Sequence, residues 1–351
     1  MKLAAIICEF NPLHTGHKRL IDYAKTIADK VVCIMSGNFT QRGLPACADK
    51  YSRAKHAVLA GADIVVELPT VYATASAENF ALGGVAIANS LGADCLVFGS
   101  ECGNIEQLKQ SINTINDADT NKRIQQEIKK GVSYPKAVAL ATGLELLSQP
   151  NNVLAIEYLK ALQHTHSNIT PFTLKREDNY NNNKPQEYAS SNALRANKQI
   201  RDKYTFDYVI HDIDDNIEER YYQVVPTFLA VATREELEKV EGVTEGLHNR
   251  IFNADKTNGY EHLIEEIKTK RYTRLKLQRV ILNYVLGITK DTVANYKDNQ
   301  PATKILAVKS SAVALLQNIK NETDEITLRA DRLYATLSGK TAPTKLVKID
   351  I

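Results

Sequence analysis

The stretch LAAIICEFNPLHTGH, residues 3–17, decides the fold. Its apolar run at residues 3–8 predicts a strand that is buried on both faces. The polar turn after this run leads directly into a helical pattern at residues 16–28. A buried strand that passes straight into a crossover helix is the repeating unit of α/β domains. The stretch therefore predicts an α/β fold with a doubly wound, Rossmann-like parallel sheet.

The same unit recurs over the first hundred residues. Further strands are predicted at residues 30–35, 63–68 and 95–98, and further helices at residues 50–60 and 77–91. Beyond Gly99 the pattern turns helical, at residues 105–115, 121–130, 134–148 and 153–163, before another strand at residues 169–175. We therefore expect a catalytic domain at residues 1–203 with a helical insertion at about 104–165.

The remainder of the chain is predicted to be mostly helical. A polar stretch at residues 179–186, with four Asn residues and one Pro, is typical of a mobile surface loop. An acidic helix at residues 207–219 precedes a helical region that we expect to run to the end of the chain. Residues 342–351 are either a short strand or a disordered tail. The sequence thus predicts a helical C-terminal domain at residues 204–351.

Composition and charge exclude several classes of protein. No stretch approaches the roughly 18 to 20 apolar residues that a membrane span needs. The apolar run at the N-terminus is too short for a secretory signal, so we expect a cytoplasmic protein that is not a membrane protein. The formal net charge of +3 is too small to imply a nucleic-acid partner by itself. The oligomeric state is not predicted.

The cysteines are expected to be free and mostly buried thiols. They are odd in number and lack CxxC spacing, and a buried Cys behaves as a small hydrophobic residue. They are Cys8, Cys33, Cys47, Cys95 and Cys102.

Two histidines mark the candidate reaction centre. His14 and His17 flank Gly16 where the first strand ends and the first helix begins, the position at which doubly wound sheets bind nucleotides. A helix N-terminus offers unpaired N–H groups to an anion, Gly16 lets a phosphate approach, and imidazoles can stabilise charge in the transition state. A chance pair of histidines and half of a zinc site are the alternatives. No Cys, Asp or His follows at ligand spacing, so no metal site is predicted.

This Asn-Pro-x-His-x-Gly-His pattern resembles the HIGH nucleotidyltransferase superfamily, which includes class I aminoacyl-tRNA synthetases and small adenylyl- and cytidylyltransferases. Members carry a second, distal motif whose hydroxyls and basic residue hold the triphosphate. The matching stretch is ASSNALR at residues 189–195, where Ser190 or Ser191 is also a candidate helix N-cap.

Further motifs narrow the resemblance to the bacterial tRNA(Met) cytidine acetate ligases. They are SGNFTQRG at residues 36–43, ELP at 67–69, FGSE at 98–101, PNN at 150–152 and IEY at 156–158. The resemblance spans nearly the whole chain and implies an ATP-dependent ligase. ATP and acetate would give acetyl-adenylate, and the acetyl group would pass to the exocyclic amine of the wobble cytidine in elongator methionine tRNA. We expect Mg²⁺ to screen the phosphates of ATP.

The second motif departs from the usual pattern of that family, which is Ala-Ser-Ala-Thr-x-Ile-Arg. Ser190 and Arg195 are retained. The departures are Ser191, Asn192 and Leu194, which put the role of the middle hydroxyl in question.

The resemblance also implies which residues bind the nucleotide. His14, His17 and Arg195 would stabilise the transition state, without a protein nucleophile. Gly99 would admit adenine or ribose and Arg176 would meet phosphate, while Asn152 would supply a bidentate amide. Surface or turn residues are the alternative for these three. The whole expected set is Ile7, Cys8, Glu9, Phe10, Asn11, Pro12, Leu13, His14, Thr15, Gly16, His17, Lys18, Arg19, Leu20, Gly99, Asn152, Arg176 and Ser190.

A basic segment at residues 268–279 is the candidate RNA contact. It contains no acidic residue, and its basic side chains alternate with Tyr272 and apolar residues. This pattern predicts an amphipathic helix whose basic side meets phosphate, with a solvated helix face as the alternative. A weaker candidate is a loop at residues 248–250. The basic residues are Lys268, Lys270, Arg271, Arg274, Lys276 and Arg279.

Two other functions remain open from the sequence. One is a nucleotidyltransferase that joins a nucleotide to a small phosphorylated metabolite, as pantetheine-phosphate adenylyltransferases do, although those chains are usually much shorter. The other is a non-catalytic RNA-binding protein with a decayed nucleotide fold, against which the intact His14, Gly16 and His17 argue.

Overall fold

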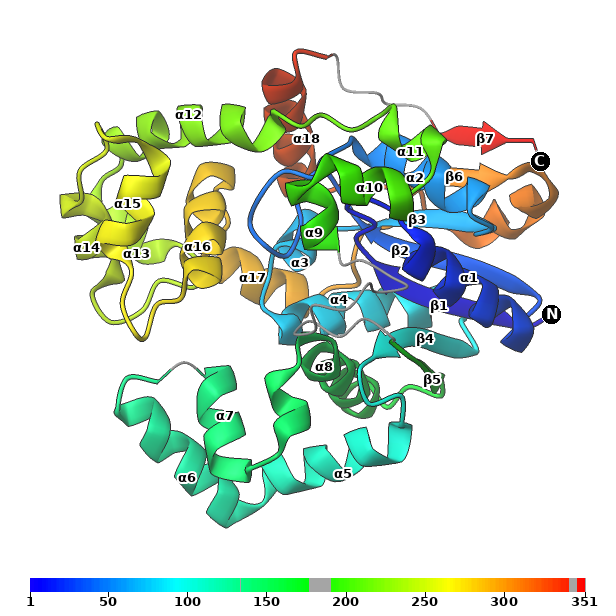
Figure 1. The fold of residues 1–351 in the computed structure, drawn as a ribbon, viewed down its shortest axis with the longest axis horizontal. Coiled ribbons are helices and arrows are strands. Elements are labelled where there is room, and N and C mark those ends of the chain that lie inside the picture. The colour runs from blue at the N-terminus through cyan, green and yellow to red at the C-terminus, as the bar shows by residue number, and fades with distance from the viewer. Residues whose placement is uncertain (133, 177–190, 341–345, 351) are drawn as a thin grey trace.

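A seven-stranded sheet forms the centre of the computed structural model, which describes residues 1–132, 134–176, 191–340 and 346–350. Its strands lie in the order β5-β4-β1-β2-β3-β6-β7 (Figure 1). All neighbours are parallel except β3 and β6. The predicted α/β fold is confirmed. The strands are β1 (Leu3–Cys8), β2 (Lys30–Ser36), β3 (Ile64–Leu68), β4 (Cys95–Ser100), β5 (Thr170–Lys175), β6 (Lys304–Lys309) and β7 (Val347–Ile349).

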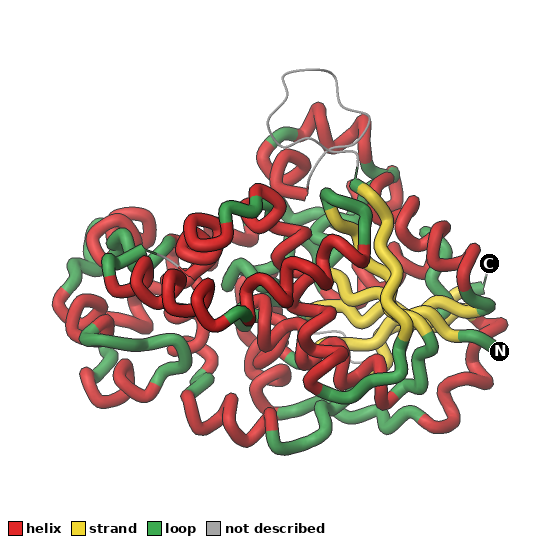
Figure 2. Tube along the Cα trace, turned by 90° about the horizontal axis from the view of Figure 1, so that it is seen from below, coloured by secondary structure: helices red, strands yellow, loops and turns green. Residues whose placement is uncertain are grey.

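Helices cover both faces of this sheet (Figure 2), as near-continuous apolar strands require. Along β1, Ala4 and Ile6 face the layer formed by α1 and α2, whereas Ala5 and Ile7 face α4 and α8. The strand therefore contributes alternate side chains to two separate hydrophobic cores. The four helices are α1 (Thr15–Ile27), α2 (Lys50–Leu59), α4 (Ala77–Ser90) and α8 (Pro150–His164).

The strand order reverses beside β1, which pairs with β2 on one side and β4 on the other. From β1 the chain proceeds outward through β2 and β3, and it then crosses back to β4. In open α/β sheets, ligands bind at the carboxyl ends of the strands at such a reversal. The ends of β1 and β4, at Cys8 and Ser100, therefore mark the expected position of a site.

Between β4 and β5 the chain forms the predicted run of helices, but the last of them, α8, packs on the sheet. α8 packs against α4 and β4, while α6 and α7 extend away from the sheet at the bottom of Figure 1. The single helix predicted at residues 134–148 is wrong, because Gly143 has a φ of 67° and separates α7 from η1. The elements are α5 (Ile105–Asn116), α6 (Ala118–Lys129), α7 (Tyr134–Thr142) and η1 (Glu145–Ser148).

A further hydrophobic core holds together the helical region on the left of Figure 1. α12 runs along this region, and its buried residues Tyr221, Val225 and Leu229 belong to that core. The acidic helix predicted at residues 207–219 is wrong, because turns at residues 211–216 separate α11 from α12. The α-helices between residues 207 and 338 are α11 (Asp207–Ile210), which packs against α2, and α12 (Ile217–Ala230), α13 (Arg234–Lys239), α14 (Leu247–Asn253), α15 (Gly259–Ile267), α16 (Arg274–Leu286), α17 (Lys290–Lys297) and α18 (Glu325–Ser338).

The chain does not stay helical to its end, contrary to the prediction. β6 pairs antiparallel with β3, and β7 pairs with β6, so the chain returns to the sheet. The run KILAVK of β6 is buried at its four central residues, but it follows a long helical region and lies outside the repeating pattern of strand, turn and helix that marks the earlier strands. The domain limits 1–203 and 204–351 stay a prediction. The remaining elements are α3 (Thr70–Ala73), α9 (Ser191–Ala196), α10 (Lys198–Tyr204) and η2 (Ser310–Asn318).

Smaller predictions have mixed outcomes. All five cysteines are free thiols, four of them buried and Cys102 partly exposed, as predicted. β7 confirms the short-strand alternative near the end of the chain. The predicted loop at residues 179–186 lies outside the described residues. In the part of the chain that the structure describes, no helix is long and apolar enough to cross a membrane.

Candidate active site

The turn from β1 to α1 is built from buried residues that are held by hydrogen bonds. The Asn11–Pro12 peptide bond is cis, and the Asn11 Oδ1 accepts a hydrogen bond of 2.8 Å from the Cys47 N–H. His14 then caps α1, because its Nδ1 accepts a hydrogen bond of 3.1 Å from the Gly16 N–H. The two histidines therefore stand at the start of the helix, where the sequence pattern places them.

His14 and His17 lie face to face, with ring centroids 3.7 Å apart, and Phe10 packs against His17 at 5.0 Å. Burial, and after it the charges of His14 and Arg176, lower the pKa of His17 well below its usual range. The His17 Nδ1 and the Thr15 Oγ1 are buried without a hydrogen-bond partner among the described residues. Buried polar atoms are normally paired, so the site offers a neutral imidazole and a hydroxyl to a ligand.

The ends of β4 and β5 bring Gly99 and Arg176 to the same edge of the sheet. The Arg176 N–H donates to the Ser100 carbonyl at 2.9 Å, directly beyond β5. The Arg176 side chain covers Gly99, since a Cβ added to Gly99 would lie 3.3 Å from the Arg176 Cγ. The charge of Arg176 also acts on the pKa of His17. Residues predicted to bind the nucleotide thus converge from the ends of three strands.

Asn152 is buried, but its amide is engaged within the protein. Its Oδ1 accepts a hydrogen bond from the Cys102 N–H at 3.1 Å. Its Nδ2 donates to the Leu146 carbonyl at 3.1 Å and to the Gln149 Oε1 at 2.8 Å. Both amide protons therefore fasten the start of α8 to neighbouring turns. A bidentate contact to a nucleotide, as predicted, would have to break these bonds.

The second motif meets the first through Arg195 of α9. Its guanidinium donates to the main-chain carbonyl of Asn11, 184 residues away in sequence. Burial, reinforced by the charge of Arg42, lowers the pKa of Arg195. The two motifs are therefore together in space. Ser190 lies outside the described residues, and Leu194 is fully buried.

Arg53 of α2 holds two loops of this site together, a role that no sequence pattern predicts. Its side chain is fully buried. Its guanidinium donates to the carbonyls of Glu9 at 2.6 Å, Ala48 at 3.0 Å and Ser36 at 3.1 Å, and also to that of Gly37. The turn after β1 is thereby tied to the loop after β2. In sequence Arg53 resembles any exposed arginine on an amphipathic helix, so only the structure identifies it.

A buried cluster of charges lies beside the same loop. The Lys50 Nζ lies 2.7 Å from a Glu67 oxygen and 2.6 Å from an Asp331 oxygen, and the Asn38 Nδ2 donates to the other Asp331 oxygen at 2.9 Å. Burial raises the pKa of Glu67 to about 7 despite the adjacent lysine. Burial alone would lower the pKa of Lys50, but the two carboxylates outweigh it and raise that pKa. Because Asp331 belongs to α18, the cluster also anchors the helical region to the sheet.

The other residues of the predicted nucleotide site divide into core and surface. Ile7, Cys8 and Leu13 are buried in the hydrophobic cores, so only their main chain can reach a ligand. Lys18 forms an ion pair of 2.5 Å with Asp22, one turn further along α1. Arg19 and Leu20 lie on the same helix.

The basic segment at residues 268–279 is not one helix, contrary to the prediction. α15 ends at Ile267 and α16 begins at Arg274, so residues 268–273 connect two helices. Neighbouring acids neutralise half of the basic side chains. The ion pairs are Lys268 with Glu265, Arg271 with Glu245, and Arg274 with Glu261.

The other basic residues of the segment differ in exposure. Lys276 lies over the Tyr272 ring at 5.0 Å, and the Arg279 Nη1 reaches the Gln41 carbonyl at 3.5 Å. Lys270 is exposed and has no ion pair among the described residues. RNA binding by this segment stays a prediction. His248, Asn249 and Arg250 lie within α14 rather than in the expected loop.

α16 packs closely on the loop after β2. Gly43 in that loop has a φ of 73°, and a Cβ added to it would lie 2.6 Å from the main-chain nitrogen of Arg279. Any other residue would clash with the backbone of α16 and would strain its own. The helical region is therefore in direct contact with a loop of the candidate active site.

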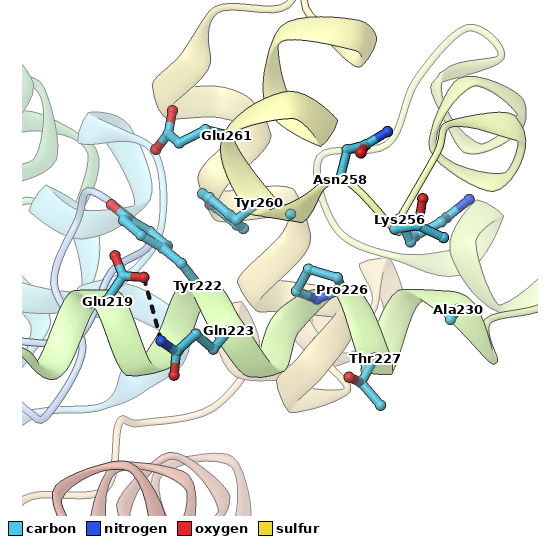
Figure 3. Close-up of a pocket in the computed structure, with 12 residues that line it drawn as sticks. Glu219, Tyr222, Gln223, Pro226, Thr227, Ala230, Lys256, Asn258, Tyr260 and Glu261 are labelled. Atoms are coloured by element: carbon cyan, nitrogen blue, oxygen red, sulfur yellow. Dashed lines mark hydrogen bonds between the residues drawn. The ribbon is translucent and has the colours of Figure 1, made fainter.

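α12 lines two separate hollows. A groove of about 580 Å³ lies between α12 and the start of α15, and Figure 3 shows Tyr222, Pro226 and Tyr260 around it. A cavity of about 260 Å³ lies instead beside Pro12 and Arg195, and Glu218 of α12 lines it. The smaller hollow is the one next to the predicted chemistry, so volume alone does not identify the active site.

Known proteins are similar over the whole chain. Residues 1–343 match the family model described as HIGH Nucleotidyl Transferase. A tRNA(Met) cytidine acetate ligase of Acetivibrio thermocellus is 36% identical, over 92% of this chain and 86% of that protein. Its counterpart from Clostridium novyi is 33% identical, over 92% and 88%. The crystal structure of Thermotoga maritima TmcAL bound with alpha-thio ATP has a TM-score of 0.82 and 25% identity, and covers 99% of this chain and 100% of that chain.

Proposed function

The chain belongs to the HIGH nucleotidyl transferase family and, within it, to the tRNA(Met) cytidine acetate ligases, and on this basis we propose what it does. It is an ATP-dependent ligase that converts ATP and acetate into acetyl-adenylate and pyrophosphate. It then transfers the acetyl group to the exocyclic amine of a cytidine in tRNA(Met). The acceptor is the wobble cytidine of the elongator tRNA.

The contact between Arg195 and the Asn11 carbonyl is the strongest structural support for this proposal. It holds the basic residue of the second motif against the turn that carries both histidines. Acetate itself attacks the α-phosphorus, so the protein need not supply a nucleophile. Catalysis then depends on positioning the reactants and stabilising charge, which is what a preorganised turn with a buried guanidinium can provide.

The residues of the turn take complementary roles in this reaction. The N-terminus of α1 offers main-chain N–H groups to the phosphates. His14, His17 and Arg195 stabilise the charge that develops on the α-phosphate and on the leaving pyrophosphate. Because its pKa is lowered, His17 is neutral at pH 7 and donates a hydrogen bond without carrying a full charge. Gly99 and Arg176 form the side of the site along β4 and β5.

Magnesium is expected to arrive with ATP. No group of three or more His, Cys, Asp or Glu side chains within the described ranges is arranged to hold a metal ion. Phosphate oxygens and water would therefore supply most of the ligands, as is common for Mg²⁺. The tRNA substrate implies a cytoplasmic location.

The proposal is tested by incubating the protein with ATP, isotopically labelled acetate and bulk tRNA, followed by digestion to nucleosides and mass spectrometry. Labelled acetylcytidine should form, and it should require ATP and tRNA together. Release of pyrophosphate without labelled acetylcytidine would mean that the acceptor is another molecule. Failure to bind ATP in a calorimeter would instead favour a non-catalytic RNA-binding protein.

A further inference from the structure

The cavity beside Pro12 combines basic and acidic side chains that come from different parts of the chain. Arg42 follows β2, and Arg195 belongs to α9. Asp214, Asp215 and Glu218 come from the segment that enters α12. Pro12 lines this cavity and Arg195 contacts the Asn11 carbonyl, so the cavity lies directly against the β1–α1 turn that carries His14 and His17. It therefore lies where a second substrate would meet the adenylate.

The three acids that line the cavity differ in how well they are paired. Asp214 forms an ion pair with Arg220. Asp215 lies 2.7 Å from the Arg201 Nη2 and 2.9 Å from the Lys198 Nζ. These two carboxylates therefore hold the surrounding helices rather than a ligand.

Glu218 is different from the two aspartates. Its nearest cationic atom among the described residues is the Arg195 Nε, at 3.9 Å, which is beyond hydrogen-bonding distance. The Tyr222 hydroxyl donates to its Oε2 at 3.4 Å, and its side chain is 36% exposed. Unlike the two aspartates, Glu218 therefore has no close ion pair among the described residues, and it lines a cavity that borders on the candidate active site.

A cytosine base matches this lining. Its Watson–Crick edge presents an exocyclic amine that donates hydrogen bonds, beside a ring nitrogen and a carbonyl oxygen that accept them. Carboxylates accept from that amine, and unstacked RNA bases are commonly bound by this edge. A volume of about 260 Å³ is below the roughly 300 to 1,000 Å³ of sites for drug-sized ligands, so it suits a single base.

We propose that this cavity receives the acceptor cytosine of the tRNA, with the Glu218 carboxylate accepting a hydrogen bond from its exocyclic amine. In the transfer, the amine nitrogen forms a bond to the acetyl carbonyl carbon. The bond between that carbon and the phosphate oxygen of the adenylate breaks, and AMP leaves with the electron pair. Glu218 takes the proton that the nitrogen loses. This inference rests on the proposed function.

The test compares Glu218→Gln with Glu219→Gln. Glu219 is the next residue of the same helical turn, but it lines the groove between α12 and α15 (Figure 3). Two reactions are measured, namely acetate-dependent exchange of pyrophosphate into ATP without tRNA and formation of acetylcytidine with tRNA. Glu218→Gln should lower acetylcytidine formation at least tenfold and exchange less than threefold. Glu219→Gln should leave both within twofold of the unaltered protein.

Base discrimination gives a second readout that a structural role would not change. Cytidine monophosphate should inhibit the transfer about tenfold better than uridine monophosphate, because uridine has a carbonyl in place of the amine. Glu218→Gln should remove this preference, since its amide can donate to that carbonyl, and Glu218→Asp should retain it.

The outcomes separate the inference from the proposed function. Acetylcytidine formation within threefold of normal in Glu218→Gln would overturn the inference, as would equal losses in both reactions or an unchanged base preference. If the unaltered protein forms no acetylcytidine at all, the proposed function fails first.

Discussion

Arg53 and Arg195 beside the β1–α1 turn are as basic as Arg271 and Arg274 of the segment 268–279, but the surroundings of the two pairs are opposite. Arg53 and Arg195 are largely buried and donate to main-chain carbonyls of loops at the candidate active site. Arg271 and Arg274 are more exposed and pair with glutamates. A buried cation acts in a medium of low dielectric constant, whereas an exposed pair is screened by water and salt. The number of basic residues in a segment therefore says little about the charge that the segment offers to a ligand.

The largest effect is expected on stability, from the removal of a buried arginine. Arg53→Met removes the hydrogen bonds that the guanidinium donates to the carbonyls of Glu9, Ser36, Gly37 and Ala48. It should lower the free energy of unfolding by about 3 to 5 kcal/mol. Urea unfolding measures the change. Arg332→Met is the control, because that side chain is 68% exposed and its loss should cost less than about 0.5 kcal/mol. Equal losses in the two variants would contradict the comparison.

The next largest effect is expected on catalysis, from a substitution of His14 in the β1–α1 turn. His14→Asn keeps an acceptor that can cap α1 but removes the imidazole, so acetate-dependent exchange of pyrophosphate into ATP should fall by about 100-fold. The helix content seen by circular dichroism should be unchanged. His164→Asn, at an exposed position near the end of α8, should keep full exchange activity. Near-normal exchange in His14→Asn would remove His14 from the mechanism.

A pH dependence follows from the buried charge cluster. The pKa of Glu67 is raised from 4.5 to about 7, so between these pH values the folded protein binds more protons than the unfolded chain. The contribution of Glu67 to the free energy of unfolding should therefore fall as the pH rises through this window, by on the order of 1 to 3 kcal/mol. Urea unfolding at several pH values, compared with Glu67→Gln, isolates this contribution. A constant difference between the two proteins would show that Glu67 has an ordinary pKa.

The smallest effect is expected on the exposed side of the comparison. Lys270→Gln should weaken tRNA binding about threefold at low salt and reduce the slope of log affinity against log salt by about 1. Filter binding over a series of salt concentrations measures both values. Lys122→Gln serves as the control, since Lys122 is also exposed but pairs with Asp119 on α6. Equal effects of the two substitutions would mean that residues 268–279 do not contact the tRNA.

Local sequence patterns sufficed for the first four strands and for the turn that carries the histidines. Each of these strands is a continuous apolar run, and each precedes a turn and a helix, so neighbouring residues contain the information. β6 is also an apolar run, but it follows the helical region rather than a turn and helix of this repeating unit, so nothing nearby indicates that it joins the sheet beside β3. The predicted basic helix failed because the backbone becomes extended at Lys268, with a ψ of 143°, and Thr273 then caps a new helix by accepting a hydrogen bond from the Lys276 N–H.

The site was less predictable than the fold. The motifs and the family resemblance pointed to the histidines, Gly99, Arg176 and Arg195, which the structure brings to one edge of the sheet or to the adjoining turn. They also included Asn152, whose amide proves to be occupied by Leu146 and Gln149. Burial of a charged side chain depends on which elements pack around it. No local sequence pattern therefore predicts the role of Arg53 or the environment of Glu218.

The antiparallel pairing of β3 with β6 has a consequence for how the enzyme is made. β3 emerges early from the ribosome, whereas β6 emerges only after the whole helical region has been synthesised. Until then β3 presents an open edge, which is the kind of surface through which nascent chains pair with one another. A ribosome that stalls before Lys304 would leave a chain that contains both nucleotide motifs but lacks the strand that covers this edge.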